Sequence, residues 1–220
     1  GGTGGITLSG TTSIGSLSAT TAATGGAINV HDVTTAGNQS YSSTSSTTFN
    51  SDYNTGGGSF TVTGPLVLAD STNITTGNGT ISLSAGSSVQ GTAGGSPEIL
   101  TLNSGTGTIT LGDVYGASSL PGVTGLTDVI ITNSGATTFD QIGITGALTQ
   151  TNAATGAATF TDTVNIGQAT LRGTTYDIQN GFNTTGAMDV TNSGLFTLGS
   201  AAPINAQGGF STTGSASLAN

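Results

Sequence analysis

A short phrase recurs along this chain at a nearly constant interval, and this repetition is the strongest constraint on its fold. Thr132–Gly135 returns as Thr191–Gly194, with a near copy at Leu102–Gly105 and a looser one at Thr151–Gly156. Counted between their asparagines, the copies that begin at 132, 151 and 191 are 19 and 40 positions apart, which are one and two steps of about 20. The chain therefore reads as a stack of repeats.

Phenylalanine follows a similar period, because Phe139 and Phe160 are 21 positions apart and Phe160 and Phe182 are 22 apart. The interval from Asn103 to the next copy of the phrase is 30 positions, about ten too many for one step. The excess falls on Gly116–Gly122, a loop-like stretch that we interpret as an insertion.

Between the turns, apolar residues alternate with small polar ones, which is the period of a half-buried strand. The runs are Ile6–Ser9, Phe60–Thr63, Ile81–Ser84, Leu100–Leu102, Ile109–Leu111, Val129–Thr132, Val164–Ile166 and Phe196–Leu198. Threonine favours strands because its branched side chain fits a pleated surface. Glycine or Asn-Gly follows almost every run, and no window has a convincing helical period. The sequence predicts a nearly all-β protein.

A period near 20 made of short strands and glycine or asparagine turns is typical of one coil of a single-stranded parallel β-helix, or β-solenoid. We predict one elongated domain over residues 1–220, with ten or eleven coils of about 20 residues in a rod roughly 50 Å long. Recurring asparagines would form amide ladders at the turns, around an internal apolar column. An antiparallel β-sandwich is the structural alternative.

The repeats are clearer in residues 76–220 than in residues 1–75. Tyr41–Ser46 and Tyr53–Ser59 are so polar that we expect exposed loops or an irregular coil there.

The composition excludes several classes of function. Charged residues make up 5% of the chain, with one Arg, no Lys and a net charge of −9, so neither nucleic acid nor anionic lipid has a basic surface to bind. Gly, Ser and Thr form about half of the chain, far above ordinary usage. There is no cysteine, and no apolar stretch is long enough to insert into a membrane.

The chain contains the TNSG and TNAATG phrases and the run Gly105–Asp113, and Lys, Arg and Cys are scarce in it. In these features it resembles the β-strand repeats of giant bacterial surface proteins of the filamentous-haemagglutinin and autotransporter-passenger kind. This resemblance implies an exported, non-catalytic, extracellular or cell-surface protein that acts in adhesion, surface coating or filament formation. It implies as partners the protein itself, by axial stacking, more of the same polypeptide, or cell-surface and matrix carbohydrate. It brings no catalytic residues with it.

Few residues offer catalytic chemistry. His31 and Asp32 are the one neighbouring His–carboxylate pair, and we interpret them as a loop histidine beside a turn-forming aspartate. A polysaccharide-active β-helix enzyme is an alternative function and needs paired carboxylates on one face. The acids of the repeat region are not spaced by multiples of 20, so a coil of that length does not place two of them reliably on one face. We interpret them as solvated turn residues: Asp113, Asp128, Asp140, Asp162, Asp177 and Asp189.

Two binding functions remain to be tested. Oxygen ligands would suit calcium, but the calcium-binding β-roll repeat is absent, and we assign no metal, cofactor or catalytic residue. Thr-x-Thr motifs at Thr61–Thr63 and Thr106–Thr110 make an ice-binding Thr-rich solenoid a further alternative, which requires threonine rows aligned over at least four coils.

The two ends of the sequence read as open repeats. Ile6–Leu8 begins a strand almost at once, and Phe210–Asn220 still reads as strand, turn and strand. Gly1–Gly5 carries no signal-peptide pattern, so we expect a processed product or a segment of a longer protein. Unpaired strand edges template further strands, so we expect further coils or a second copy to continue the stack.

Overall fold

The computed structural model describes residues 4–9, 12–21, 25–92, 96–115, 125–151, 156–199 and 202–218, all as strands and connecting turns without a helix. The strands lie on three faces, called A, B and C. In every coil the chain forms a strand on face B, then one on face C and then one on face A.

Face A holds β3 (Leu17–Thr21), β6 (Gln39–Ser43), β9 (Phe60–Thr63), β16 (Ala136–Phe139), β19 (Ala158–Phe160) and β22 (Tyr176–Ile178), with the first parts of β12 (Ile81–Gly91) and β14 (Thr108–Tyr115) and the last parts of β24 (Met188–Leu198) and β26 (Phe210–Leu218). Face B holds β1 (Ile6–Leu8), β4 (Ile28–Val30), β7 (Thr47–Phe49), β10 (Leu66–Leu68), the ends of β12 and β14, β17 (Ile142–Gly143), β20 (Val164–Ile166), β23 (Phe182–Thr184) and β25 (Ile204–Ala206). Face C holds β2 (Thr12–Ile14), β5 (Val33–Thr35), β8 (Tyr53–Asn54), β11 (Thr72–Thr75), β13 (Glu98–Asn103), β15 (Leu126–Asn133), β18 (Ala147–Gln150), β21 (Gln168–Gly173) and the starts of β24 and β26.

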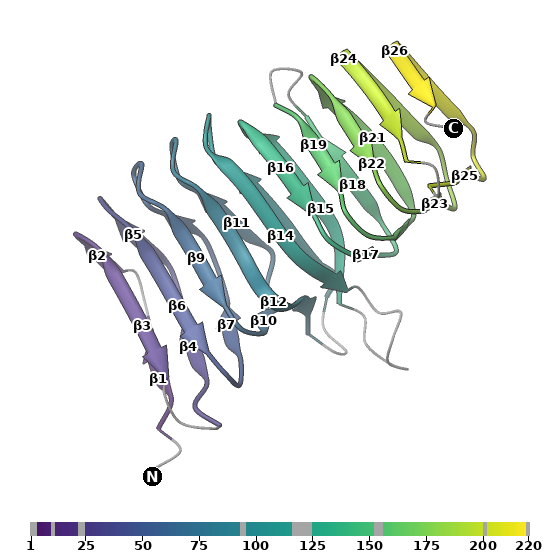
Figure 1. The fold of residues 1–220 in the computed structure, drawn as a ribbon. Coiled ribbons are helices and arrows are strands. Elements are labelled where there is room, and N and C mark those ends of the chain that lie inside the picture. The colour runs from purple at the N-terminus through teal and green to yellow at the C-terminus, as the bar shows by residue number, and fades with distance from the viewer. Residues whose placement is uncertain are drawn as a thin grey trace.

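Each strand pairs in parallel with the strand of the same face in the next coil, as Phe139 does with Phe160 and Val164 with Phe182. The described chain thus stacks ten strands on each face, and nine steps of about 4.8 Å give a rod about 43 Å long. Figure 1 shows the coils following one another from β1–β3 at the N-terminal end to β24–β26 at the other. The predicted parallel β-solenoid is confirmed, and the antiparallel sandwich is wrong because all the pairings are parallel.

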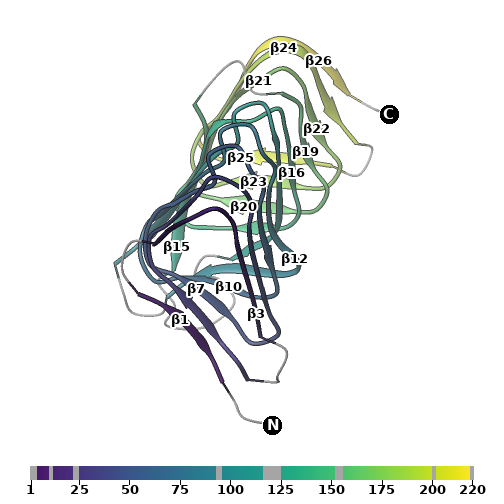
Figure 2. The ribbon, with the colours of Figure 1, turned by 90° about the vertical axis from the view of Figure 1, so that its left-hand side faces the viewer.

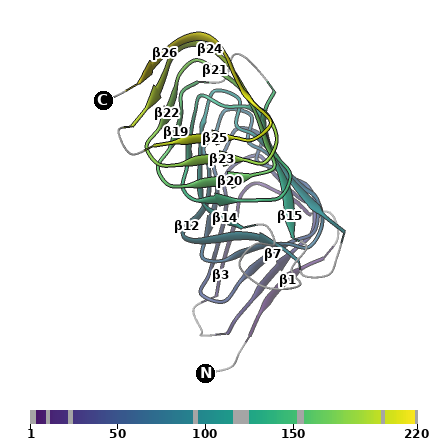
Figure 3. The same ribbon diagram turned by 90° about the vertical axis from the view of Figure 1, so that its right-hand side faces the viewer.

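Seen after a turn of 90°, the coils superpose as loops whose orientation shifts gradually along the stack (Figures 2 and 3). Most coils are close to the predicted length, since Ile6 pairs with Ile28 and Ile28 with Thr47. Two steps take 28 residues, for example from Ile81 to Ile109 and from Ile109 to Thr137.

Most of the extra residues of the two long coils lie between faces B and C, and a few lie in β12 between faces A and B, where the register shifts between Leu83 and Ser88. In one coil the residues between faces B and C fall between Gly91 and Glu98, and in the next between Tyr115 and Leu126. The second segment contains the predicted insertion Gly116–Gly122, which lies outside the described residues. Asn103 still pairs with its counterpart Asn133, so the ladder closes across this extra length.

The core is a continuous apolar column formed by the inward residues of the three faces. Phe139, Phe160 and Phe182 are fully buried in it, and the rings of Phe139 and Phe160 stack at 4.7 Å. Phe182 does not follow Phe160 in the same ladder, although the interval between them is close to the repeat. Phe160 pairs with Ile178 on face A, whereas Phe182 lies on face B and meets the Phe160 ring edge-on at 5.2 Å across the interior.

Strands occupy the parts of the N-terminal third where loops were expected, because Tyr41 lies in β6 and Tyr53 in β8. Tyr41 and Tyr53 lie inside the core with Phe49 and Phe60, and the centroids of the Tyr41 and Phe49 rings are 5.2 Å apart. The Tyr41 hydroxyl donates to Gln39 Oε1 at 2.9 Å, so the polar end of this ring is satisfied inside the core. Within these two segments, residues 44–46 and 55–59 form the turns.

The recurring Asn-Ser-Gly phrase forms the corner between faces C and A. The buried Ser104 hydroxyl donates to Gly107 O at 2.8 Å, and Asn103 Oδ1 accepts from Gly105 N at 3.1 Å. Gly105 has φ 57°, a conformation that favours glycine. Thr76 repeats this arrangement one coil earlier, with its hydroxyl 2.6 Å from Gly79 O.

The copy of the phrase at 191–194 adopts a different arrangement, because β24 runs through this corner as one strand. Asn192 points inward with 5% exposure, and its Nδ2 donates to Gly194 O at 2.6 Å and Ser215 O at 3.0 Å. The asparagine of the copy at 151–156 lies outside the described residues.

Candidate functional site

The His31–Asp32 pair forms the turn between β4 and β5. His31 Nδ1 lies 3.4 Å from Asp32 Oδ2, and Asp32 has φ 41°, as a turn-forming aspartate can adopt. The Ser51 hydroxyl hydrogen bond is the main cause that lowers the pKa of Asp32 below its ordinary value, against the opposing effect of burial.

The six acids predicted as turn residues divide into two groups. Asp140 and Asp162 do lie in turns, each two residues before the paired Ile142 and Val164, so they occupy equivalent positions in successive coils. Their separation of 22 equals the local coil length, which the comparison of neighbouring acids along the sequence had missed. The turn assignment is wrong for the other four, which lie on strands: Asp113, Asp128, Asp177 and Asp189.

The carboxylates of Asp113, Asp140 and Asp162 lie near Tyr115 at the corner between faces A and B. Burial is the main cause that raises the pKa of Tyr115, and Asp113, Asp162 and Asp140 raise it further by their charge. Each carboxylate has a local donor within hydrogen-bond distance. Asp162 accepts from Thr163 N at 2.6 Å, whereas Asp113 shares the Tyr115 hydroxyl with Gln141 Oε1 and Asp140 shares the Thr161 hydroxyl with the carbonyl of Phe139.

Neither a metal-binding cluster nor a membrane-spanning helix is found in the described part of the chain. No group of three or more His, Cys, Asp or Glu side chains there is arranged to hold an ion. No helix long and apolar enough to cross a bilayer occurs among the same residues.

A row of hydroxyl side chains runs along the outside of face A. Ladder pairing aligns serine or threonine over seven successive coils, at Ser18, Ser40, Thr61, Ser82, Thr110, Thr138 and Thr159. Threonine itself holds three consecutive positions of the row, and Asp177 ends it. The row is short of four aligned threonines, but it is a longer hydroxyl array than the scattered Thr-x-Thr motifs indicated.

A column of asparagines lies on the outside of face B near the C-terminal end of the stack. Asn165 pairs with Asn183, and Asn183 with Asn205, on β20, β23 and β25. Asn183 Nδ2 donates to Asn165 Oδ1 at 2.9 Å, so this ladder forms on a face rather than at a turn as predicted. Gly143 occupies the next position of the column and leaves it without a side chain.

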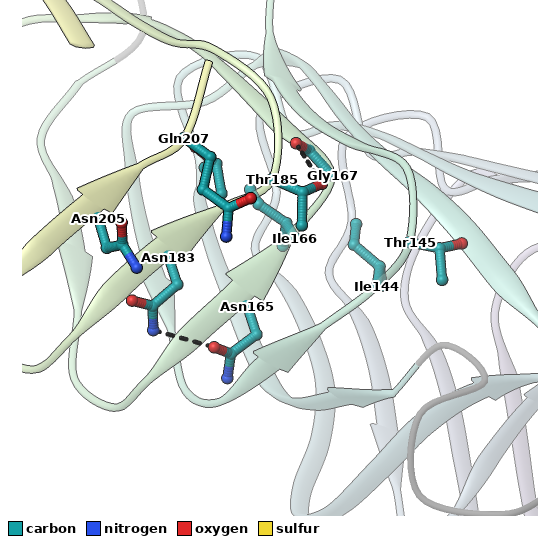
Figure 4. Close-up of a pocket in the computed structure, with 10 residues that line it drawn as sticks. Ile144, Thr145, Asn165, Ile166, Gly167, Asn183, Thr185, Asn205 and Gln207 are labelled. Carbon is teal, nitrogen blue, oxygen red and sulfur yellow. Dashed lines mark hydrogen bonds between the residues drawn. The ribbon is translucent and has the colours of Figure 1, made fainter. Parts of the chain in front are cut away.

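These asparagines form one wall of a groove of about 400 Å³. Thr145, Thr185 and Gln207 line the opposite side, where the chain leaves face B, and Ile144 and Ile166 lie between the walls (Figure 4). Thr145 and Thr185 are exposed, whereas the two isoleucines are 4% exposed and form an apolar floor. No charged residue lines this groove.

A second groove of about 340 Å³ adjoins the first around the corner between faces B and C, and the two share Thr145, Gly167 and Thr185. Asp128 lines this second groove and accepts from Ala147 N at 2.7 Å and from the Thr127 hydroxyl at 2.9 Å.

The sequence reasoning missed this groove, although a signal for it was present. Each asparagine stands between two strand residues, in Val164–Ile166, Phe182–Thr184 and Ile204–Ala206, at intervals of 18 and 22. Alternation places that middle residue outward on every strand.

Both ends of the stack have open edges in the described chain. The strands β1, β2 and β3 pair on one side alone, and so do β25 and β26. Inward residues of these end coils are less covered than those of the middle coils. Ile6, Leu8 and Ile204 are half-buried and Phe210 is 44% exposed.

Comparison with known proteins gives no match: no family model, no curated protein and no solved structure is similar to this chain.

Proposed function

We propose that this chain is a structural and adhesive segment of a secreted bacterial surface or extracellular filament protein, and that its role is non-catalytic. The observation that carries the proposal is the unbroken parallel ladder, ten strands deep on each face, which ends in open edges. Such a rod holds its surface residues at a regular spacing over tens of ångströms. The scarcity of charge and the resemblance to giant bacterial surface proteins support the extracellular setting.

The proposed partner at the ends is a further stack of the same kind, either more of the same polypeptide or a second copy. In such a stack, β25 would pair with a strand like β1, which aligns Ile204 with Ile6 and buries both. The exposed Phe210 ring, 5.8 Å from that of Phe196, would be covered by the next coil of face C. The end faces carry no lysine that would oppose this pairing.

A matched pair of variants tests axial assembly. Phe210 and Leu195 are both 44% exposed, but Phe210 lies in the last coil and Leu195 in the coil before it. Light scattering and cryo-electron microscopy of the 220-residue chain should show head-to-tail assembly, which Phe210→Lys abolishes and Leu195→Lys preserves. A concentration-independent monomer with both ends visibly capped would contradict the proposal.

A second candidate function is ice binding, supported by the hydroxyl row on face A. Its side chains repeat at about 4.8 Å on a rigid surface, and a regular array of this kind can order water. Thr138 lies within the row, and Thr191 is also an exposed threonine, on face C. If face A binds ice, Thr138→Lys should abolish inhibition of ice recrystallisation and Thr191→Lys should leave it unchanged; absence of inhibition in the parent chain would reject this candidate.

The polysaccharide-active enzyme considered from the sequence is not proposed. Asp113, Asp140 and Asp162 gather at one corner, but local hydroxyl and amide donors engage all three carboxylates.

A further inference from the structure

We propose that the groove beside Asn165, Asn183 and Asn205 binds a neutral polysaccharide chain that lies along the axis of the solenoid. This inference deepens the adhesive part of the proposed function by naming the ligand class, and it does not depend on axial assembly.

The groove offers hydrogen-bonding groups in both directions. A carboxamide has two donor hydrogens and an accepting oxygen, so it can contact two neighbouring hydroxyls of a sugar at once. Within the described residues, the side-chain amides of Asn205 and Gln207 have no hydrogen-bond partner. The one amide–amide bond among these residues, from Asn183 to Asn165, leaves the Asn183 oxygen and the Asn165 amide hydrogens without a partner in the described chain.

The opposite wall complements these amides. The Thr185 hydroxyl donates to Gly167 O at 3.3 Å, which leaves its lone pairs available to accept. Ile144 and Ile166, each 4% exposed, close the base of the groove between the two walls.

Charge selects against anionic ligands. The lining residues carry no charge, and the adjoining groove contributes the Asp128 carboxylate. The one Arg, at position 172, lies on face C, and the chain as a whole carries −9. Sulfated or uronic-acid sugars would therefore meet negative charge without a cation to pair with.

The repeat of the column favours a polymer over a single sugar. Asn165, Asn183 and Asn205 follow one another at the strand spacing of about 4.8 Å, so each coil presents one amide per sugar-sized step. On face B in the described chain, no other outward side chain repeats in three successive coils; the positions before Asn165 are Thr7, Asn29, Thr48, Val67, Gln90, Tyr115 and Gly143.

The test is a titration of the 220-residue chain with three neutral hexasaccharides, cellohexaose, chitohexaose and mannohexaose, followed through the side-chain amide signals in 15N-resolved NMR spectra. We expect at least one of them to shift the signals of Asn165, Asn183, Asn205 and Gln207. The double variant Asn165→Ala/Asn205→Ala should weaken its binding about tenfold or more.

Asn29→Ala is the matched control, because Asn29 is an exposed asparagine in the same outward column of face B at the other end of the stack. It should bind as the parent does, and all variants should keep the parent's circular dichroism spectrum. The proposal is overturned if no neutral hexasaccharide shifts these signals, if Asn29→Ala loses binding equally, or if hexagalacturonate binds more tightly. Retained axial assembly in any of these cases would leave the structural role standing.

Discussion

The Tyr53 hydroxyl donates a hydrogen bond to the carbonyl oxygen of Val30, 2.8 Å away inside the core. Val30 lies on face B and Tyr53 on face C of the next coil, so this bond links two faces through the interior. Its donor is a phenol that has to stay protonated, because a phenolate at this position would lose the bond and be buried as a charge.

Alkaline pH should therefore unfold the protein. Burial is the main cause that raises the pKa of Tyr41, Tyr53 and Tyr176 above the ordinary value of 10.0. Folded pKa values above the unfolded value mean that these phenols contribute their full stability below pH 10 and that this stability is lost as the pH rises beyond it. Absorbance at 295 nm should rise together with the loss of the β-type circular dichroism spectrum.

The matched variant for this effect is Tyr53→Phe, which should move the alkaline transition to higher pH and lower the stability at pH 7 by about 1 kcal/mol. Titration of all four tyrosines near pH 10 with the fold intact would contradict the assignment of three as buried.

Phe160→Ala should destabilise the protein by about 3–5 kcal/mol, because Phe160 is fully buried between the stacked ring of Phe139 and the edge-on ring of Phe182. Leu195→Ala, at a 44% exposed position, should change the free energy of unfolding by less than about 0.5 kcal/mol. Urea denaturation of both variants measures the difference, and equal effects would show that the ring lies outside the core.

Gly64→Ala should be strongly destabilising, by about 2 kcal/mol or more. Gly64 has φ 97°, and a Cβ at this position would overlap the carbonyl oxygen of Ser43 in the preceding coil. Gly15→Ala is the control, since no atom lies within 4 Å of a Cβ there. Thermal unfolding of both variants checks the prediction, and it fails if Gly64→Ala melts with the parent.

Ser104→Ala should cost about 1 kcal/mol, because it removes the buried hydroxyl that donates to Gly107 O at the corner between faces C and A. Ser82→Ala removes an outward hydroxyl of face A and should be neutral within about 0.5 kcal/mol. Chemical denaturation distinguishes them, and a neutral Ser104→Ala would show that the corner does not depend on this bond.

The single Arg172 allows a test of the ladder by proteolysis. Arg172 lies in β21 and pairs with Thr191 of the next coil, so trypsin cannot draw its backbone into an extended substrate conformation without opening the stack. The folded chain should resist trypsin, and the urea-unfolded chain should give two fragments, residues 1–172 and 173–220. Rapid cleavage of the folded chain would place Arg172 in a mobile segment.

The repeat spacing predicts the architecture well because a solenoid returns to the same face at a nearly constant interval. The recurring phrase predicts that Asn103 and Asn133 are equivalent across an extra ten residues, and they pair in the structure. Phe139 and Phe160 likewise pair at their predicted interval. Those pairings depend on residue spacing alone, which the sequence states directly.

The spacing fails where coil length varies or where composition conceals the core. The coil from Phe160 to Ile178 takes 18 residues, so a fixed step of 22 wrongly assigns Phe182 to face A. Tyr41 and Tyr53 are surrounded by Ser, Thr, Asn and Gly, and their burial depends on hydroxyl partners such as Gln39 and the Val30 carbonyl, which are brought close by folding. The asparagine groove depends on three coils meeting in register, which no single segment reveals.

The hydrogen bonds between coils run along the axis of the rod, and this has a mechanical consequence. A force that pulls the two ends apart opens an end coil first, because the strands of that coil are paired on one side alone. A coil such as the one from Ile6 to Ile28 would release 22 residues. Fully extended, they span about 75 Å in place of one step of about 4.8 Å. The rod is therefore stiff under small loads and lengthens more than tenfold, coil by coil, under large ones.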